Sequence, residues 1–395
     1  MNEYLGFQCC LKINDALYFP SFRGNGLFRY DGEEVECIAC FEEKGVKLFS
    51  GIESYGQKLF FTPFAANRIY TYDLSNKKIS SICYDGHRSG DFAFSVLYGH
   101  CIYMFPSQYP GILKLNLVTL NIEKINDWMY GDFKKYQLED NAFFKGEYVQ
   151  KDDVIYAPFL NASAVMEFNL NDGSSIVHGI GVQGYETIAD DGKQFWMMSG
   201  NGTMIVCWNS CTDEIKVYEK FPENYKQGTF VGSYFGKGYV WLFPESANMV
   251  LKVDTMTGGV TEERLYSKVC KHKWLSYSLW SSSFIFVARE KEKVLLCCGK
   301  SSQVIEFDVC GNKLKCSRLH MPREISRQYH EEPDIEYVRF RKIKYTERKN
   351  QRKFFFESEE YLLHEFLEDV ERDDKVEEEP WQDLSAGELI YKNIL

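Results

Sequence analysis

The sequence lacks the features that mark a membrane protein or a leader segment. No run approaches the roughly 18 consecutive apolar residues that a membrane helix needs. The first residues, MNEYLGFQCCLKIND, contain no basic stretch followed by an apolar one, so no secretory signal is predicted. From these absences we expect a cytoplasmic protein with no membrane among its partners.

Motifs for metals and cofactors are missing too. The seven histidines are scattered without a His-x-His or HExxH pattern. No P-loop, dinucleotide fingerprint or nucleophile elbow occurs. We therefore predict no metal and no cofactor. Positive charge is also in deficit, because 46 Lys and Arg face 57 Asp and Glu, and a net charge of −11 argues against nucleic acid as a partner.

The 13 cysteines fall largely within apolar strand patterns, where free cysteine acts as a small hydrophobe. One Cys-x-x-Cys pair occurs, Cys37-Ile-Ala-Cys40. Its flanks read as a strand, in which residues three apart point to opposite faces. We therefore predict neither a redox nor a zinc role for this pair.

What the sequence does contain is aromatic residues, 16% of the chain, and a repeat. An Asp or Asn, called here the anchor, ends a short strand seven times at intervals of 40 to 54 residues. Thirteen residues before each anchor stands a large apolar residue, aromatic in six of the seven units. Pro marks the end of that earlier strand in five units, since Pro cannot donate to a sheet ladder. The anchors are Asp31, Asp73, Asn116, Asn169, Asn209, Asp254 and Asp308, and the earlier residues, called the aromatic row, are Tyr18, Phe60, Tyr103, Tyr156, Trp196, Trp241 and Leu295.

Further strands before and after these two give four strands per unit, which is the pattern of a β-propeller blade. We predict an all-β fold over residues 1–320: a single propeller of about seven four-stranded blades, with six as the alternative. The aromatic row is expected to fill the layers between blades. The repeat resembles propellers of the kelch, NHL and YVTN kind in architecture, without the signature residues of any one family. That resemblance implies a fold and leaves function open.

Residues 321–395 are predicted to form a charged C-terminal extension. Alternation at Ile335, Tyr337 and Phe340 indicates a strand, and a second apolar strand, 353–356, follows it. Ser358 is a candidate N-cap for an amphipathic helix near 358–372. The basic run at 339–353 is expected to pair within the chain with the acidic residues that follow it, in preference to binding nucleic acid.

In propellers that this chain resembles, ligands bind near the central channel, on the face formed by two sets of loops. One set joins the second and third strands of a blade, and the other joins one blade to the next. Polar residues at these places suit an anionic or sugar-like ligand, because Arg forks onto carboxylate and phosphate. The candidate ligand-binding residues are Arg23, Arg68, His87, Arg88, Asp91, Tyr109, Asn161 and Glu245.

Two main classes of function follow, and a scaffold whose C-terminal helix recruits a partner is a third reading. The first is a non-catalytic propeller that binds a protein or a small ligand on its loop face. The alternative is a lyase or hydrolase that acts on a saccharide or peptide-like substrate in the central funnel. In that case His87, Asp91, Arg23 and Glu245 would converge. The sequence leaves open whether the protein is an enzyme.

Overall fold

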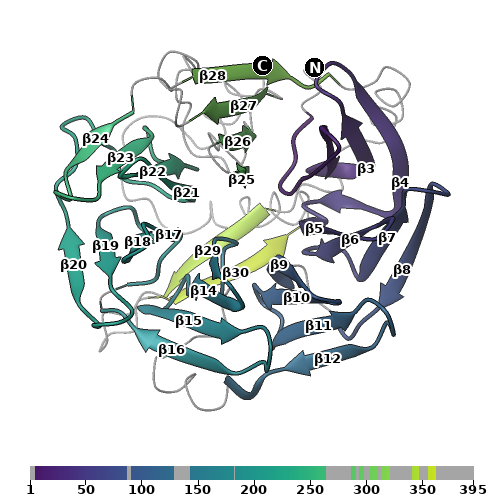
Figure 1. Cartoon of the computed structure of the whole chain (residues 1–395), viewed down its shortest axis with the longest axis horizontal. Coiled ribbons are helices and arrows are strands. Elements are labelled where there is room, and N and C mark those ends of the chain that lie inside the picture. The colour runs from purple at the N-terminus through teal and green to yellow at the C-terminus, as the bar shows by residue number, and fades with distance from the viewer. Residues whose placement is uncertain are drawn as a thin grey trace, which may run out of the picture. The chain divides into compact units, whose positions relative to one another are not determined.

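The computed structural model describes residues 5–86, 90–128, 143–181, 183–263, 286–290, 293–297, 303–308, 313–320, 340–346 and 355–361. The chain divides into two compact units, Met1–Tyr329 and His330–Leu395. In the first unit, seven four-stranded antiparallel sheets follow one another around a ring (Figure 1). The fold is therefore the seven-bladed propeller that the repeat predicts. No helix in the described part of the chain is long and apolar enough to span a bilayer.

Each blade consists of four strands that are consecutive in the chain, and blades are numbered here in chain order. Blade 1 contains β1 (Leu11–Ile13), β2 (Ala16–Pro20), β3 (Arg23–Tyr30) and β4 (Val35–Val46). Blade 2 contains β5 (Phe49–Tyr55), β6 (Lys58–Pro63), β7 (Arg68–Asp73) and β8 (Lys78–Cys83). Blade 3 contains β9 (Phe92–Tyr98), β10 (Cys101–Pro106), β11 (Ile112–Asn116) and β12 (Ile122–Ile125).

The remaining four blades have the same order. Blade 4 contains β13 (Val149–Lys151), β14 (Val154–Pro158), β15 (Ala164–Asn169) and β16 (Ser175–Gly179). Blade 5 contains β17 (Ala189–Asp190), β18 (Phe195–Met198), β19 (Ile205–Trp208) and β20 (Ile215–Tyr218). Blade 6 contains β21 (Phe230–Gly236), β22 (Tyr239–Pro244), β23 (Leu251–Asp254) and β24 (Val260–Glu262). Blade 7 contains β25 (Phe286–Glu290), β26 (Lys293–Cys297), β27 (Gln303–Asp308) and β28 (Lys313–Arg318).

The fixed offset in the sequence is a strand register. In every blade the residue of the aromatic row lies directly opposite the residue two before the anchor, as in Tyr18 opposite Arg29 and Trp241 opposite Lys252. The anchor itself makes the next turn. In blades 1 to 6 its side-chain oxygen accepts hydrogen bonds from backbone N–H groups two or three residues further on, which is an Asx turn.

The aromatic row lies between blades, as predicted. Each of its residues packs in a hydrophobic layer formed with the next blade, so that Trp196 of blade 5 contacts the layer that holds Val240 and Leu251 of blade 6. Phe60, Tyr103, Trp196 and Trp241 are buried, whereas the remaining three are half-buried. Burial of large aromatic side chains is the main stabilising contribution available to such a ring.

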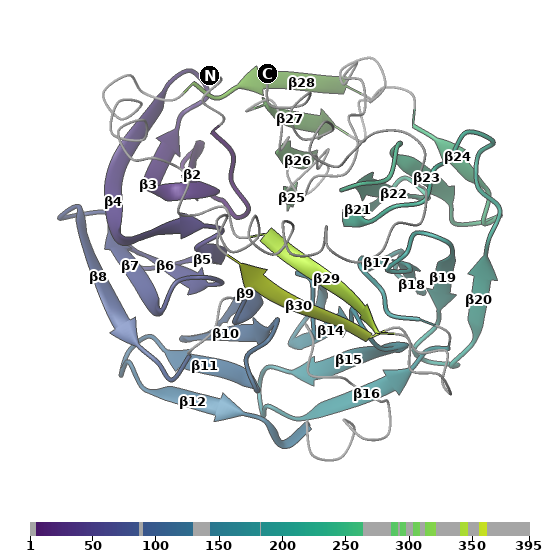
Figure 2. The same ribbon diagram turned by 180° about the vertical axis from the view of Figure 1, so that it is seen from behind.

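Ring closure uses side-chain packing. In the described strands, blades 1 and 7 share no sheet, because each is built from four consecutive strands (Figure 2). The closing layer contains Cys297 and Val304 of blade 7 with Leu17 and Phe28 of blade 1. Leu5 and Phe7, which precede the first strand, fill the same layer.

The second unit contains one antiparallel pair, β29 (Phe340–Thr346) and β30 (Phe355–Tyr361). Its register sets residues of opposite charge directly opposite one another, such as Lys342 with Glu359 and Lys344 with Glu357. Ser358 lies within β30, so the prediction that a helix begins there is wrong. The rest of the predicted helix, 362–372, lies outside the described residues.

Candidate functional site

The first strands of three blades share an irregularity where the chain arrives from the loop face. In β5, β9 and β21 one residue bulges out of the ladder, opposite the Pro that ends the second strand: Pro63, Pro106 and Pro244. A bulge adds one residue to one strand and changes which side chains face inward. Ser95 of β9 and Ser233 of β21 consequently occupy equivalent buried positions, each three residues past the Phe that starts its strand.

Both serines bind a glutamate from another part of the ring. Ser95 Oγ donates to Glu53 Oε1 of β5 at 3.0 Å. Ser233 donates through its backbone N and its Oγ to Glu147 Oε2, at 3.1 and 3.2 Å. Glu147 lies two residues before the first strand of blade 4, whereas Ser233 belongs to blade 6, so this contact bypasses blade 5. Burial raises the pKa of the Glu53 carboxyl to about 7, against the opposing hydrogen bond from Ser95.

On the loop face a lysine lies between two glutamates, and we call these three residues the lysine site. The Nζ of Lys145 donates to Glu186 Oε1 at 2.8 Å and to Glu245 Oε2 at 2.6 Å. Glu186 also accepts from the backbone N–H of Phe230 at 2.6 Å. The three charged residues come from three connections: the one between β12 and β13, the one between β16 and β17, and the one between β22 and β23.

The lysine site is partly withdrawn from solvent. The side chain of Glu186 is 4% exposed, and those of Lys145 and Glu245 are 23% and 33% exposed. Burial raises the pKa of Glu186 despite the neighbouring ammonium. Burial acts against ionisation of Glu245 too, but Lys145 outweighs it and holds that pKa below its usual value. Burial likewise opposes the charge on Lys145, yet the two glutamates raise its pKa, so the lysine is a cation held by carboxylates.

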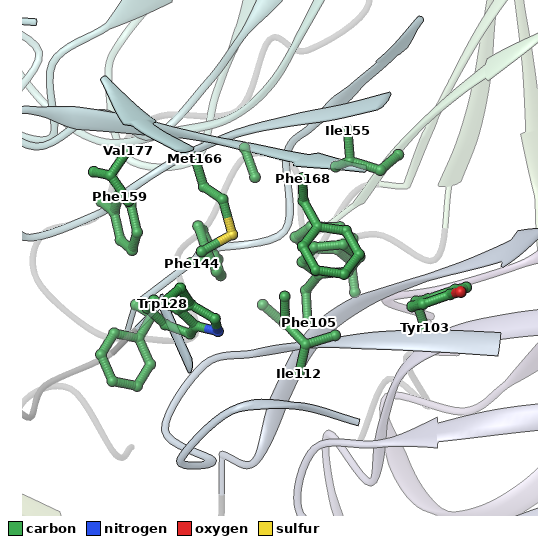
Figure 3. Close-up of a cluster of buried hydrophobic side chains, with 14 of the residues drawn as sticks. Tyr103, Phe105, Ile112, Trp128, Phe144, Ile155, Phe159, Met166, Phe168 and Val177 are labelled. Atoms are coloured by element: carbon green, nitrogen blue, oxygen red, sulfur yellow. The ribbon is translucent and has the colours of Figure 1, made fainter. Parts of the chain in front are cut away.

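The backbone segment that carries Lys145, residues 143–148, is fixed to blades 3 and 4. Phe143 donates its N–H to the carbonyl of Ser107 at 2.6 Å and accepts from Leu160 N at 2.8 Å. Phe144 packs in the layer between blades 3 and 4, beside Phe159 (Figure 3). The ring of Tyr148 stacks on Phe94 with 4.5 Å between centroids.

Gly146 explains how this segment passes so close to blade 3. Its φ of 136° lies in the region that favours glycine, and a β-carbon there would stand 3.3 Å from the Ala93 carbonyl. Residues 143–148 are therefore held in a position from which the side chains of Lys145 and Glu147 reach blades 5 and 6.

Two of the sequence-predicted residues lie together in a second cluster. Asp91 is buried and accepts a hydrogen bond from Tyr84 OH at 2.7 Å. Tyr109 is buried as well, and its hydroxyl donates to Asp85. Burial raises the pKa of both tyrosines above the ordinary value. These contacts tie down the connection between β8 and β9, which is a structural use of the side chains.

The remaining predicted residues are dispersed. Glu245 belongs to the lysine site. Arg68 is exposed and directs Nη1 to Ser81 Oγ of the outer strand β8, at 3.3 Å. Asn161 is exposed in the connection between β14 and β15. The backbone of Arg23 begins β3, paired with Val46, and its side chain is not described; His87 and Arg88 lie outside the described residues.

Sequence reasoning missed Lys145 and Glu186. Both lie in connections between blades, where the repeat sets no register. One signal was available, because the connection from Ile125 to Val149 is far longer than an ordinary strand connection, and loops of that length usually serve a purpose of their own. Among the described residues, no group of three or more His, Cys, Asp or Glu gathers in a way that could hold a metal ion.

Comparisons with known proteins show similarity in fold alone. No protein-family model matches the sequence, and no curated protein matches it either. Among solved structures, virginiamycin B lyase from Staphylococcus aureus, crystallised with quinupristin, is similar with a TM-score of 0.55 and 13% identity, over 75% of this chain and 93% of the lyase. The computationally designed protein Ika8 has a TM-score of 0.52 and 10% identity, over 80% of this chain and 88% of its own.

A third similar structure is the extracellular domain of a protein described as a one component system from B. thetaiotaomicron. Its TM-score is 0.54 at 14% identity, over 81% of this chain and 39% of that one. A lyase, a designed protein and an extracellular domain thus share the ring with this chain, which is a β-propeller. At such identities the common fold does not transfer an activity.

Proposed function

We propose that this propeller is a non-catalytic binding protein that holds a small, hydroxyl-rich ligand on its loop face, at the lysine site. The observation that carries the proposal is the ammonium of Lys145 between two carboxylates from separate connections. A site assembled from several blades is fixed by the whole ring, which is the preorganisation that favours binding.

The chemistry of the cluster selects among ligands. An ammonium has three N–H donors, and among the described residues its partners are the two glutamates, which leaves a donor for a ligand oxygen. The carboxylates of Glu186 and Glu245 are acceptors for ligand hydroxyls. An anionic ligand would meet two negative charges and one positive charge, so repulsion disfavours it. A neutral, sugar-like ligand both donates and accepts, and therefore fits better than an anion.

A second candidate is the lyase or hydrolase. It is favoured by one observation, the raised pKa of Glu186 beside a lysine, since a carboxyl whose pKa lies nearer neutrality can serve as a general acid. The convergence of His87, Asp91, Arg23 and Glu245 stays a prediction, because His87 and the side chain of Arg23 lie outside the described residues. In the described part of the chain, Asp91 accepts from Tyr84 and Glu245 pairs with Lys145.

The proposal is tested by calorimetric titration with neutral disaccharides such as cellobiose and maltose, and with glucuronate as an anionic counterpart. We expect a neutral saccharide to bind, and Lys145→Met to weaken that binding at least about tenfold, the effect of losing a hydrogen bond to a charged donor. Lys151→Met is the matched control, because Lys151 also pairs with a carboxylate, Asp190, at 2.9 Å, but at the far end of β13.

Three outcomes separate the candidates. Loss of binding in the Lys145 variant with retention in the Lys151 variant supports the proposal. Binding of glucuronate alone would contradict the choice of ligand class. Conversion of the saccharide to new products, followed by mass spectrometry, would replace the binding function with the enzymatic one.

A further inference from the structure

Cys37 and Cys40 both lie on β4, the outermost strand of blade 1. In a regular strand, residues three apart point to opposite faces of the sheet, and on that basis the sequence predicts no joint role for these thiols. The register of β4 against β3 shows that this strand is irregular at the pair. Leu27 lies opposite Ala39, but the next residue, Phe28, lies opposite Cys37, so Ile38 is bulged out of the ladder.

The bulge puts the two cysteines on one face. Residues directly opposite in an antiparallel pair share a face, so Cys37 is on the face of Phe28. Cys40 lies opposite Gly26, two residues before Phe28, and residues two apart on a strand share a face as well. Because of the extra residue in β4, the side chains of Cys37 and Cys40 lie on the same face of the sheet instead of on opposite faces. The prediction that their side chains point apart is wrong.

The two thiols differ in their exposure to solvent, which allows one of them to react before the other. Cys37 is half-buried and packs against the closing layer between blades 7 and 1. Its thiol donates to the Ala39 carbonyl at 3.4 Å. Cys40 is exposed, and the glycine opposite it has no side chain to cover it. Burial, and then the neighbouring Cys40 thiol through charge and a side-chain hydrogen bond, raise the pKa of Cys37 to about 12.

We propose that Cys37 and Cys40 are a dithiol that closes reversibly to an intramolecular disulfide by exchange with a low-molecular-weight disulfide such as oxidised glutathione. The thiolate of exposed Cys40 attacks one sulfur of glutathione disulfide, forms a mixed disulfide and releases one glutathione thiolate. The sulfur of Cys37 then gives up its proton, attacks Sγ of Cys40 and releases the second glutathione. The two cysteines lose two electrons and two protons, and the glutathione disulfide is reduced to two thiols.

The order of attack follows from access and ionisation. The thiolate is the nucleophile in exchange, and the exposed residue meets the oxidant first. Cys37 is half-buried, and burial raises its pKa, so it acts second, as the resolving thiol. At that stage the mixed disulfide is already beside it, and no encounter in solution is needed. This inference is independent of the ligand proposed for the lysine site.

The test is incubation of the folded full-length chain with oxidised glutathione, followed by alkylation and mass mapping of the peptide that contains residues 37 and 40. We expect the wild-type peptide to lose the mass of two hydrogen atoms and to resist alkylation until a reductant is added. Cys37→Ser is expected to stop at the mixed disulfide, so that its peptide keeps one glutathione on Cys40. Cys37→Ala provides a second form of this trap should the serine variant fold poorly.

A matched control is supplied by Cys83, an exposed cysteine at the end of the outer strand β8. It is expected to keep its glutathione in wild-type protein, because no neighbouring thiol is placed to resolve it in the described part of the chain. A wild-type peptide that keeps glutathione on Cys40, like Cys83, would overturn the proposal. So would recovery of both thiols in reduced form while Cys83 has reacted.

Discussion

The hydrophobic layers between blades differ from the lysine site in the side chains that they require, although neighbouring residues of the same segments contribute to both. The layer around Trp196 needs only volume and apolar surface, supplied by many residues at fixed positions in the repeat. The lysine site needs three charged groups held within hydrogen-bond distance, with partners for each, in a setting partly withdrawn from water. The comparison teaches that the stability of this ring comes from apolar residues at repeated positions. The charged residues that could bind a ligand lie outside the repeat.

The largest expected effect comes from the apolar side of the comparison. Trp196 is fully buried between blades 5 and 6, so Trp196→Ala should lower the free energy of unfolding by about 3–5 kcal/mol, through lost burial and the cavity left behind. Urea unfolding followed by fluorescence and circular dichroism measures it. Met256→Ala is the control, because Met256 is 94% exposed, and it should change stability by less than about 0.5 kcal/mol. Equal effects of the two variants would show that the layer is not what holds the ring.

The next effect tests whether the charges of Lys145, Glu186 and Glu245 stabilise one another. Lys145→Met leaves Glu186 and Glu245 close together without the cation between them, and it should cost about 3 kcal/mol near neutral pH. Glu245→Gln removes only one charge and keeps a hydrogen-bond acceptor for the lysine, so it should cost about 1 kcal/mol. Urea midpoints for the two variants give the order. A greater loss for the glutamine variant would mean that Glu245, and not Lys145, is the centre of the site.

The buried hydrogen bond between Ser95 and Glu53 can be tested through its pH dependence. Burial raises the pKa of Glu53 from 4.5 to about 7, so the folded chain holds a proton that the unfolded chain releases. The associated stabilisation is complete below pH 4.5 and is lost as pH rises to about 7, by about 3 kcal/mol at most. Glu53→Gln keeps a partner for Ser95 without a charge, so its stability should change less over this range and exceed that of the wild type at higher pH. Parallel stability–pH curves for the two proteins would contradict the assignment.

The smallest expected effect concerns the turns that repeat around the ring. Asp254 accepts backbone hydrogen bonds from Met256 and Thr257, and these bonds lower its pKa. Asp254→Ala should lower the midpoint of thermal unfolding by a few degrees at most, because the turn loses its backbone hydrogen bonds, whereas Asp254→Asn should leave it nearly unchanged because an amide oxygen also accepts. Thermal unfolding distinguishes the two. An asparagine variant as unstable as the alanine variant would point to the charge instead of the turn.

The fold was accessible from the sequence to a large extent. Tyr18, Phe60 and their equivalents stand at one offset from an anchor, and the structure shows that this offset is the cross-strand register. Strand register and turn type are local properties, so a periodic sequence can report them without knowledge of the rest of the chain. The prediction that a C-terminal helix starts at Ser358 was wrong, because the apolar spacing of a short segment fits a strand as well as a helix.

The candidate site was accessible only in part. Glu245 was predicted because it follows a strand end on the loop face, but its partner Lys145 is 100 residues away in the chain. Asp91 and Tyr109 were also predicted on the loop face, and they lie together, yet their hydroxyl and carboxylate groups fasten a connection. Position in a repeat indicates which face a residue lies on, whereas its partners depend on how the long connections fold over that face.

The sequence by itself determined the propeller architecture of about seven blades in chain order and the apolar layers between them, because alternation, turn residues and a fixed offset act over a few residues at a time. Only the tertiary structure decided that Lys145 stands between Glu186 and Glu245, that Glu147 reaches Ser233 past a whole blade, and that a bulge brings Cys37 and Cys40 to one face. The physical reason is that hydrogen bonds and charge pairs depend on distances of a few ångströms between segments far apart in the chain, and the closed ring sets those distances.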